Sequence, residues 1–418
     1  MMESPRCIPA PFSDCSADGL EATLHEIFSE SPAQVKQREI TALDILLADR
    51  GGRCVVFGAG NMGRRVLTAL QALGVKPLAI SDNNSALWGT SVEGLPVLPP
   101  DEAGERYGKD AVFFIAIRNE NHWFQETFQQ LGYLGCAHIS SSEPIACRFP
   151  EIFPPFLLYD LPHKVYMHSD ALLRAADIWA DDASRAEYLA QVQLRALGDP
   201  FALAEPAIAE SYFLPGVFQL EPEDVFLDCG AFDGDTIRSV IELKMDFERI
   251  HAIEADSHSF ARLASYVATL PPSLRDKIRL HPCAIGSTRG TVRFDDTGSA
   301  VSKVSDQGQI LVEMVPIDVM FAARRVSMIK MDIEGGEYDA LLGAKQVIQR
   351  DRPILAICVY HSQQDLWRLP LLMRELCPEH RMYLQAYRGD GIQTVAYAVP
   401  PERVLGKRQV KQPRALDL

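Results

Sequence analysis

Acidic residues flank a glycine-rich segment in the second half of the chain. The string Asp228-Cys229-Gly230-Ala231-Phe232-Asp233-Gly234 follows an apolar run, and Glu254 closes the next apolar run. Glycines permit a tight turn and a close approach between backbone and ligand. A carboxylate before the first glycine is poorly placed against a pyrophosphate but well placed against an ammonium group, and Glu254 can accept hydrogen bonds from both hydroxyls of a ribose. This pattern favours S-adenosylmethionine over a dinucleotide.

We extend this predicted cofactor site to small and apolar residues at the ends of neighbouring strands. Ala284-Ile285-Gly286 is expected to end the third strand of the sheet and to offer a surface suited to adenine. The predicted cofactor-binding residues are Asp228, Gly230, Ala231, Phe232, Asp233, Gly234, Glu254, Ala255, Ala284 and Ile285.

Three further residues are candidates for catalysis. Asp332 and Glu334 lie in the string Lys330-Met331-Asp332-Ile333-Glu334-Gly335 after the fourth apolar run, and His361 follows the fifth. Methyl transfer requires mainly that the acceptor be aligned and relieved of its proton. Asp332 is expected to take that proton or to hydrogen-bond the acceptor, and His361 is a second candidate because imidazole titrates near neutral pH.

A structural explanation competes for the same acids. Asp332 and Glu334 would also serve to cap the following helix or to pair with Lys330. Carboxylate oxygens suit Mg²⁺, but the sequence names no third ligand, and we therefore predict no metal.

A second glycine motif lies near the N-terminus. Gly58-Ala59-Gly60-Asn61-Met62-Gly63 follows an apolar run and opens a helical pattern, and Asp82 ends the next apolar run. This is the dinucleotide fingerprint in its usual context. Gly58, Gly60, Gly63 and Asp82 therefore form a possible nucleotide site. The alternative is that the glycines only permit a tight turn from strand to helix.

The elements that position these motifs alternate between strands and helices, which predicts two α/β units. Each unit is expected to hold a Rossmann-like sheet. We divide the chain into a helical N-terminal segment (1–50), a Rossmann-like domain (51–141), a helical connector (142–215) and a larger α/β domain (216–418). The runs 381–387 and 392–399 flank a glycine turn and predict an antiparallel hairpin that closes the second sheet.

Composition limits the partners and the compartment. Lys and Arg number 41 against 56 Asp and Glu among 418 residues, a net charge of −15, which disfavours nucleic acid. The nine cysteines are scattered without a C-x-x-C pair, which favours a reducing cytoplasm over a disulfide framework. No apolar stretch is long enough to predict a membrane span. The sequence leaves open whether two chains form a homo-oligomer.

The second half resembles the FkbM family of S-adenosylmethionine-dependent methyltransferases. The resemblance spans about residues 211–400 and is carried by DVFLDCGAFDGDT, IHAIEAD, CAIG and above all IKMDIEGGEYDALLGA. It implies a seven-stranded methyltransferase sheet with the cofactor beyond the carboxyl ends of the strands. It also implies O-methylation of hydroxyl groups on sugars or natural products.

The run DNNSALWGTSVEGLPVLPPDE in the first half resembles the N-terminal domain of sugar acyltransferases that bind nucleotide-linked sugars. This resemblance covers about residues 51–141 and implies binding of a nucleotide or a nucleotide-linked sugar more than hydride transfer. From the FkbM resemblance we expect an O-methyltransferase that acts on a saccharide or a glycosylated metabolite. Two alternatives remain: an NAD(P)-dependent oxidoreductase that uses the N-terminal motif, and a non-catalytic protein that binds nucleotides or sugars.

Overall fold

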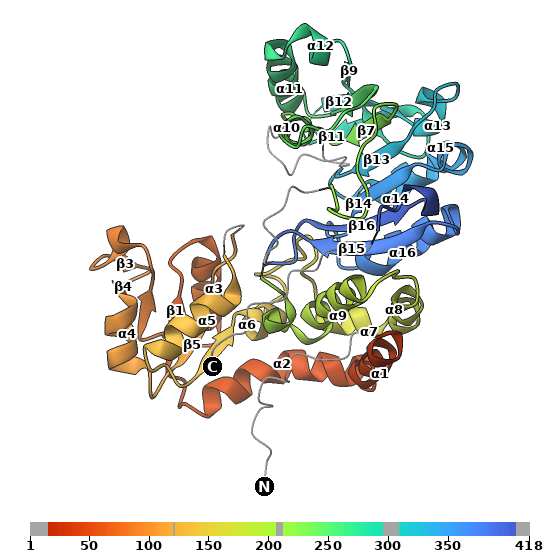
Figure 1. The fold of residues 1–418 in the computed structure, drawn as a ribbon. Helices are drawn as coiled ribbons and strands as arrows, with labels where there is room; N and C mark the ends of the chain where they lie inside the picture. Colours follow the sequence, from red (N-terminus) through yellow and green to blue (C-terminus); the bar gives the residue numbers. More distant parts are fainter. Residues whose placement is uncertain (1–15, 120–121, 206–211, 296–307, 309, 407–418) are drawn as a thin grey trace. The chain divides into compact units, whose positions relative to one another are not determined.

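The computed structural model describes residues 16–119, 122–205, 212–295, 308 and 310–406. The chain divides into two compact units, shown in Figure 1. The first unit comprises residues 1–173, 186–207 and 388–392, and the second comprises 174–185, 208–387 and 393–418. The expected connector 142–215 is thus shared between the units.

The first unit is built on a six-stranded sheet with the order β3-β4-β2-β1-β5-β6. All neighbouring strands are parallel except β3 and β4. This is the α/β sheet expected from the alternating apolar runs. The strands are β1 (Cys54–Phe57), β2 (Ala79–Ser81), β3 (Ser91–Val92), β4 (Leu95–Leu98), β5 (Val112–Ile115) and β6 (Ile139–Ser141).

The helices of the N-terminal segment begin where capping residues allow them to begin. Ser31 and Gln34 form a capping box, and Pro32 occupies the first turn of the second helix, as the Ser-Pro pair predicts. Two of the unit boundaries, after residues 173 and 185, fall within α8 and α9. The helices up to residue 202 are α1 (Ala17–Ile27), α2 (Pro32–Ala48), α3 (Asn61–Ala72), η1 (Ser85–Leu87), α4 (Pro100–Tyr107), α5 (Phe124–Tyr133), α6 (Glu143–Arg148), α7 (Pro162–Tyr166), α8 (Ser169–Ala176), α9 (Asp182–Leu197) and η2 (Pro200–Ala202).

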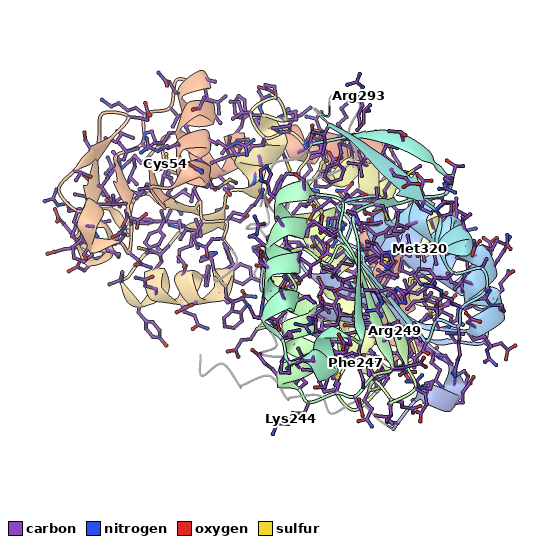
Figure 2. All side chains as sticks on the ribbon, turned by 90° about the horizontal axis from the view of Figure 1, so that it is seen from above. Cys54, Lys244, Phe247, Arg249, Arg293 and Met320 are labelled. Atoms are coloured by element: carbon purple, nitrogen blue, oxygen red, sulfur yellow. The ribbon has the colours of Figure 1, made fainter. Side chains whose placement is uncertain are left out.

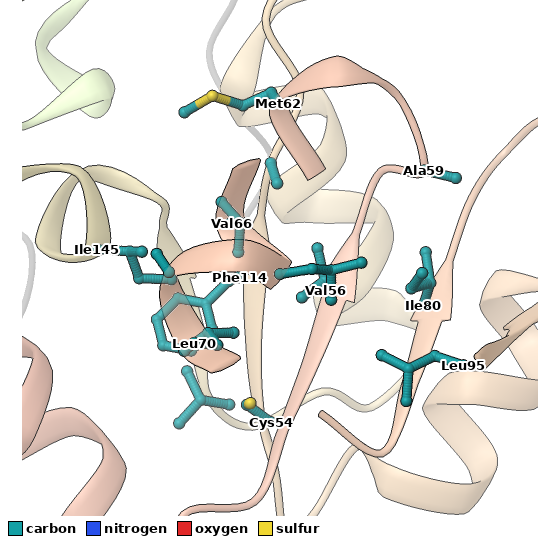
Figure 3. Close-up of a cluster of buried hydrophobic side chains, with 14 of the residues drawn as sticks. Cys54, Val56, Ala59, Met62, Val66, Leu70, Ile80, Leu95, Phe114 and Ile145 are labelled. Atoms are coloured by element: carbon teal, nitrogen blue, oxygen red, sulfur yellow. The ribbon is translucent and has the colours of Figure 1, made fainter. Parts of the chain in front are cut away.

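An apolar cluster fixes the first sheet against its helices. Val56 on β1 and Phe114 on β5 face Val66 and Leu70 on α3, and all four side chains are fully buried (Figure 3). Burial of such side chains stabilises the fold by roughly 1.5–3 kcal/mol each. This packing holds α3 in place, and the helix begins at Asn61, within the glycine motif.

The second unit contains a seven-stranded sheet with the order β15-β16-β14-β13-β7-β8-β9. Strand β16 runs antiparallel to both of its neighbours, which confirms the predicted hairpin, and the pairs from β14 to β9 are parallel. The chain order reverses between β7 and β13, where open α/β sheets bind ligands. The strands are β7 (Val225–Cys229), β8 (Arg249–Ile253), β9 (Ile278–His281), β13 (Met328–Met331), β14 (Ile354–Cys358), β15 (Arg381–Ala386) and β16 (Thr394–Val399).

Helices lie between the consecutive parallel strands of this sheet along the chain. Figure 1 shows α13 to α16 together on one side. In Figure 2, Lys244, Phe247 and Arg249 follow one another along the turn into β8, at the amino edge of the sheet and opposite the site described below. The helices are α10 (Asp235–Glu242), α11 (Ser257–Thr269), α12 (Pro272–Arg275), α13 (Ile317–Met320), α14 (Glu337–Leu342), α15 (Lys345–Asp351), α16 (Asp365–Leu376) and η3 (Pro401–Arg403).

A separate three-stranded sheet corrects one expectation. It has the order β10-β12-β11 and consists of β10 (Ala284–Ile285), β11 (Gly290–Phe294) and β12 (Ile310–Val315). The third strand of the large sheet ends at His281, because Pro282 offers no N–H for the ladder. Ala284 and Ile285 then pair with Met314 and Val315 instead of ending that strand.

Two further findings concern the described residues only. None of their helices is both long and apolar enough to cross a membrane. The cysteines among them are free thiols, namely Cys54, Cys136, Cys147, Cys229, Cys283, Cys358 and Cys377.

Candidate active site

The predicted site residues of the second unit meet at the carboxyl edge of its large sheet. Gly230 follows β7 with a φ of 78°, and a Cβ atom at this position would lie 1.9 Å from the carbonyl oxygen of Asp332, which follows β13. Only glycine fits there. The glycine-rich segment and the Asp332 segment are therefore packed against each other at the switch point.

Asp228 does not have the surroundings that the sequence suggested. Its carboxylate is fully buried, and its Oδ1 atom lies 3.0 Å from the Nζ atom of Lys330, the residue beside it in the register of β7 and β13. Lys330 also donates to the carbonyl of Gly230 at 2.7 Å. The charge of Asp228 is thus already compensated by a buried cation, so this geometry does not support Asp228 as the partner of a ligand's ammonium group.

Glu254 holds the glycine-rich segment in place. Its Oε2 atom accepts from the backbone N–H of Phe232 at 2.8 Å, and its Oε1 atom accepts from that of Asp256 at 2.7 Å. These bonds support the positive φ of Phe232, 46°, which is unusual for a non-glycine residue. Burial raises the pKa of Glu254 to about 7, against the effect of both backbone donors.

The other predicted cofactor residues lie around this segment. Gly234, with a φ of 92°, is the N-cap of α10 and supplies no side-chain cap. Asp233 forms an ion pair with Arg238. Ala255 packs against the cluster that contains Ala284 in the small sheet. Ala231 and Ile285 are buried.

An acid–histidine cluster lies next to the glycine-rich segment. The Nε2 atom of His361 is 3.1 Å from Oδ1 of Asp332 and 3.6 Å from Oε2 of Glu334. The other ring nitrogen, Nδ1, is 2.9 Å from Oε1 of Glu337. The imidazole is 1% exposed, whereas Asp332 and Glu334 are each 18% exposed. The three predicted catalytic residues are therefore brought together, with Asp332 and Glu334 open to solvent at one side.

Sequence reasoning missed the residues that surround this cluster. Tyr212 and Tyr360 donate to Asp332 at 2.5 and 3.0 Å, and Glu337 also accepts from the backbone N–H of Ile333 at 2.8 Å. Tyr360 precedes His361 directly and Glu337 lies in the motif string, so both positions offered a local signal. Tyr212 comes from a segment more than a hundred residues away and offered none.

The predicted pairing of Lys330 with Asp332 or Glu334 is replaced by its pair with Asp228. Burial alone would raise the pKa of Asp332, but the close contact with the imidazole of His361 and its charge hold that pKa well below its usual range. Burial alone would lower the pKa of His361, but Glu337 and the other acids hold it well above its usual range. Burial raises the pKa of Glu334. The cluster thus stabilises positive charge at its centre.

The match to known proteins covers the part of the chain that forms this site. Residues 228–389 match the methyltransferase FkbM domain family. The chain contains an FkbM methyltransferase domain. This confirms the resemblance carried by the glycine-rich and IKMDIEG strings, and the seven-stranded sheet confirms the fold that it implied.

Two relatives are similar to larger parts of the chain. The 2-O-methyltransferase NoeI of Sinorhizobium fredii is 25% identical over 196 residues, which cover 40% of this chain and 77% of NoeI. The crystal structure of methyltransferase FkbM from Methylobacillus flagellatus KT has a TM-score of 0.69 and 22% identity, covering 91% of this chain and 98% of that one. At this identity the second likeness supports the fold alone.

The N-terminal glycine motif lies outside the FkbM domain. Gly58 has a φ of 117°, and a Cβ atom at Gly63 would lie 1.9 Å from the carbonyl oxygen of Gly58. Asp82 accepts from the backbone N–H groups of Ala59 and Asn84, each at 2.7 Å. Two of these glycines thus serve close packing, Gly60 is the N-cap of α3, and Asp82 ties the turn to β2. Nucleotide binding at this site stays a prediction.

Proposed function

We propose that the protein transfers a methyl group from S-adenosylmethionine to a hydroxyl group of a saccharide or a glycosylated metabolite. The observation that carries the proposal is a contact between two segments at the carboxyl edge of the seven-stranded sheet. The Glu254-supported glycine-rich segment, suited to a nucleoside, lies directly against the acid–histidine cluster, suited to a hydroxyl. NoeI, by its name a 2-O-methyltransferase, supports oxygen as the acceptor atom.

The residues of the glycine-rich segment fit the nucleoside part of this cofactor. The two carboxylate oxygens of Glu254 offer about four lone-pair positions, of which the backbone N–H groups of Phe232 and Asp256 use two. The remaining positions suit the two hydroxyls of a ribose. When bound, S-adenosylmethionine supplies a methyl carbon activated by a positively charged sulfur.

The acid–histidine cluster handles the acceptor. A hydroxyl must lose its proton as its oxygen gains the methyl group, so a nearby base lowers the barrier. Asp332 already accepts from two tyrosines and is a weak base because its pKa is depressed. Glu334 has only His361 as a close partner among the described residues. We therefore assign proton acceptance to Glu334 and orientation of the hydroxyl to Asp332.

The proposal is tested on the full chain in two steps. Calorimetry with S-adenosylhomocysteine measures cofactor binding, and transfer of a labelled methyl group to a panel of saccharides measures turnover. Asp332→Asn is expected to bind S-adenosylhomocysteine as the unaltered chain does but to lose turnover. Absence of S-adenosylhomocysteine binding at millimolar concentration would overturn the proposal.

The negative net charge and the free thiols among the described residues agree with a small-molecule acceptor in a reducing compartment. We accordingly propose a cytoplasmic location. A fractionation experiment that found the protein in an oxidising compartment would contradict it.

A further inference from the structure

The acid–histidine cluster to which we assign the acceptor also presents a set of potential metal ligands, and methyl transfer as proposed above does not depend on a metal there. Asp332, Glu334 and His361 each offer one atom, and these three atoms lie within 4.8 Å of one another. Two come from the segment after β13 and one from the segment after β14, so neighbouring strands fix their positions. Each of these atoms has a lone pair for a cation when the two carboxylates are ionised and the imidazole is neutral.

The separations suit a small divalent cation. Ligands at right angles around a cation about 2.1 Å away are about 3 Å apart. The Nε2 atom of His361 lies 3.1 Å from Oδ1 of Asp332 and 3.6 Å from Oε2 of Glu334. Two of the three separations are thus near the value for a shared cation, and the third, between the two carboxylates, is at most 4.8 Å.

The histidine supplies an independent observation. Its imidazole is 1% exposed, and neither ring nitrogen makes a hydrogen bond of acceptable geometry with the described residues. The Nδ1 atom faces the buried carboxylate of Glu337 at 2.9 Å, an arrangement that favours the proton on Nδ1. A carboxylate behind a histidine commonly orients the other nitrogen toward a metal. Here the Nε2 atom lies near the carboxylates of Asp332 and Glu334, and ionised carboxylates accept hydrogen bonds but donate none.

We propose that Asp332, Glu334 and His361 bind a divalent cation, with Glu337 as the positioning residue for the imidazole. Two carboxylates and one imidazole form a mixed donor set that suits Mn²⁺ better than Ca²⁺, which prefers oxygen ligands alone. Three protein ligands leave further coordination positions for water or for hydroxyl oxygens of an acceptor.

The cation's role in methyl transfer rests on the function proposed above, whereas its binding does not. A bound cation lowers the pKa of a coordinated hydroxyl and fixes its direction. An acceptor with two adjacent hydroxyls would occupy two of the free positions, so the site favours a vicinal diol of a sugar.

The test uses Mn²⁺ alone as the probe on the full chain. Electron paramagnetic resonance of added MnCl₂ is expected to show one tightly bound Mn²⁺ per chain, with nitrogen coupling from a directly coordinated imidazole. Glu334→Gln is expected to weaken Mn²⁺ binding by at least about tenfold. The matched control is Asp339→Asn, which removes an exposed acid from α14, and it is expected to bind Mn²⁺ as the unaltered chain does.

Calorimetry with S-adenosylhomocysteine separates this inference from the proposed function. Glu334→Gln is expected to retain S-adenosylhomocysteine binding, which also shows that the variant is folded. Binding of S-adenosylhomocysteine without stoichiometric Mn²⁺ binding overturns the cation site but leaves the proposed function intact. Equal weakening of Mn²⁺ binding by Asp339→Asn, or a signal without nitrogen coupling, also overturns it.

Discussion

The ionisation of Glu254 provides a sharp test of the cofactor site. This carboxylate supports the glycine-rich segment and has lone pairs left for a ribose, yet burial raises its pKa to about 7. A protonated carboxyl has fewer acceptor positions and must turn its own O–H toward a donor. The affinity for S-adenosylhomocysteine is therefore expected to rise with pH through the neutral range.

The size of this effect follows from the fraction of Glu254 that is ionised. With a pKa of about 7, that fraction is about nine-tenths at pH 8 and about one-tenth at pH 6. If only the ionised form binds S-adenosylhomocysteine, the dissociation constant increases about tenfold as the pH falls from 8 to 6, which corresponds to about 1.4 kcal/mol of binding free energy. The dependence should be nearly flat from pH 8 upward until the amino group of the ligand titrates.

Calorimetric titration of the full chain at several pH values between 6 and 8 is the assay. Glu254→Gln should bind more weakly at pH 8 and lose the pH dependence, because an amide does not titrate in this range. The matched control Glu248→Gln alters an exposed acid before β8 and should retain the slope. A slope that persists in Glu254→Gln would refute the reasoning and direct attention to Asp228, whose pKa burial raises to about 6.

Three further predictions concern stability. His251 is 1% exposed, and burial lowers its pKa to about 4 from an ordinary 6.5, so the unfolded chain takes up a proton at this residue before the folded chain does as the pH falls. The free energy of unfolding should therefore decrease by up to about 3 kcal/mol between pH 6.5 and pH 4. Thermal unfolding at both pH values should show a smaller loss of stability in His251→Gln than in the unaltered chain. Gly230→Ala should lower the free energy of unfolding by several kcal/mol, because its Cβ atom would lie 1.9 Å from the carbonyl oxygen of Asp332. Gly51→Ala, which is also at positive φ but in open space, should lower it by only about 1–2 kcal/mol. Equal losses for the two variants in urea unfolding would contradict the close approach at Gly230. Tyr212→Phe removes a donor to the carboxylate of Asp332 and should cost about 1.5–3 kcal/mol, and an unchanged urea midpoint would show that this hydrogen bond is not formed.

Much of the fold could be predicted because its strands have a strong pattern. The buried strands β7, β8, β13 and β14 are mainly apolar, as is typical of parallel strands covered on both faces. The position of Ala284 and Ile285 was wrong because a short apolar string does not reveal its partner. Pairing with β12 depends on residues about thirty positions later, and Pro282 was the local sign that β9 had ended.

The convergence of the candidate catalytic residues was predictable in part. Asp332 and His361 each follow a strand, and parallel neighbours end at the same edge of a sheet, so their proximity follows from topology. The third potential metal ligand could not be chosen from sequence, because the rotamer that directs Nε2 of His361 toward Asp332 depends on Glu337 behind the ring. Side-chain direction is set by packing and not by spacing along the chain.

The buried partner of Asp228 has a consequence for how the site handles charge. Asp228 lies near the end of β7, at the edge where ligands bind, but the register of β7 and β13 places Lys330 beside it, and the two buried charges compensate each other. Negative charge near the cofactor must therefore come from elsewhere. The acid–histidine cluster holds Asp332, Glu334 and Glu337 around one imidazole, so even a protonated His361 leaves an excess of negative charge. That excess favours a cationic methyl donor or a divalent cation at the same edge of the sheet.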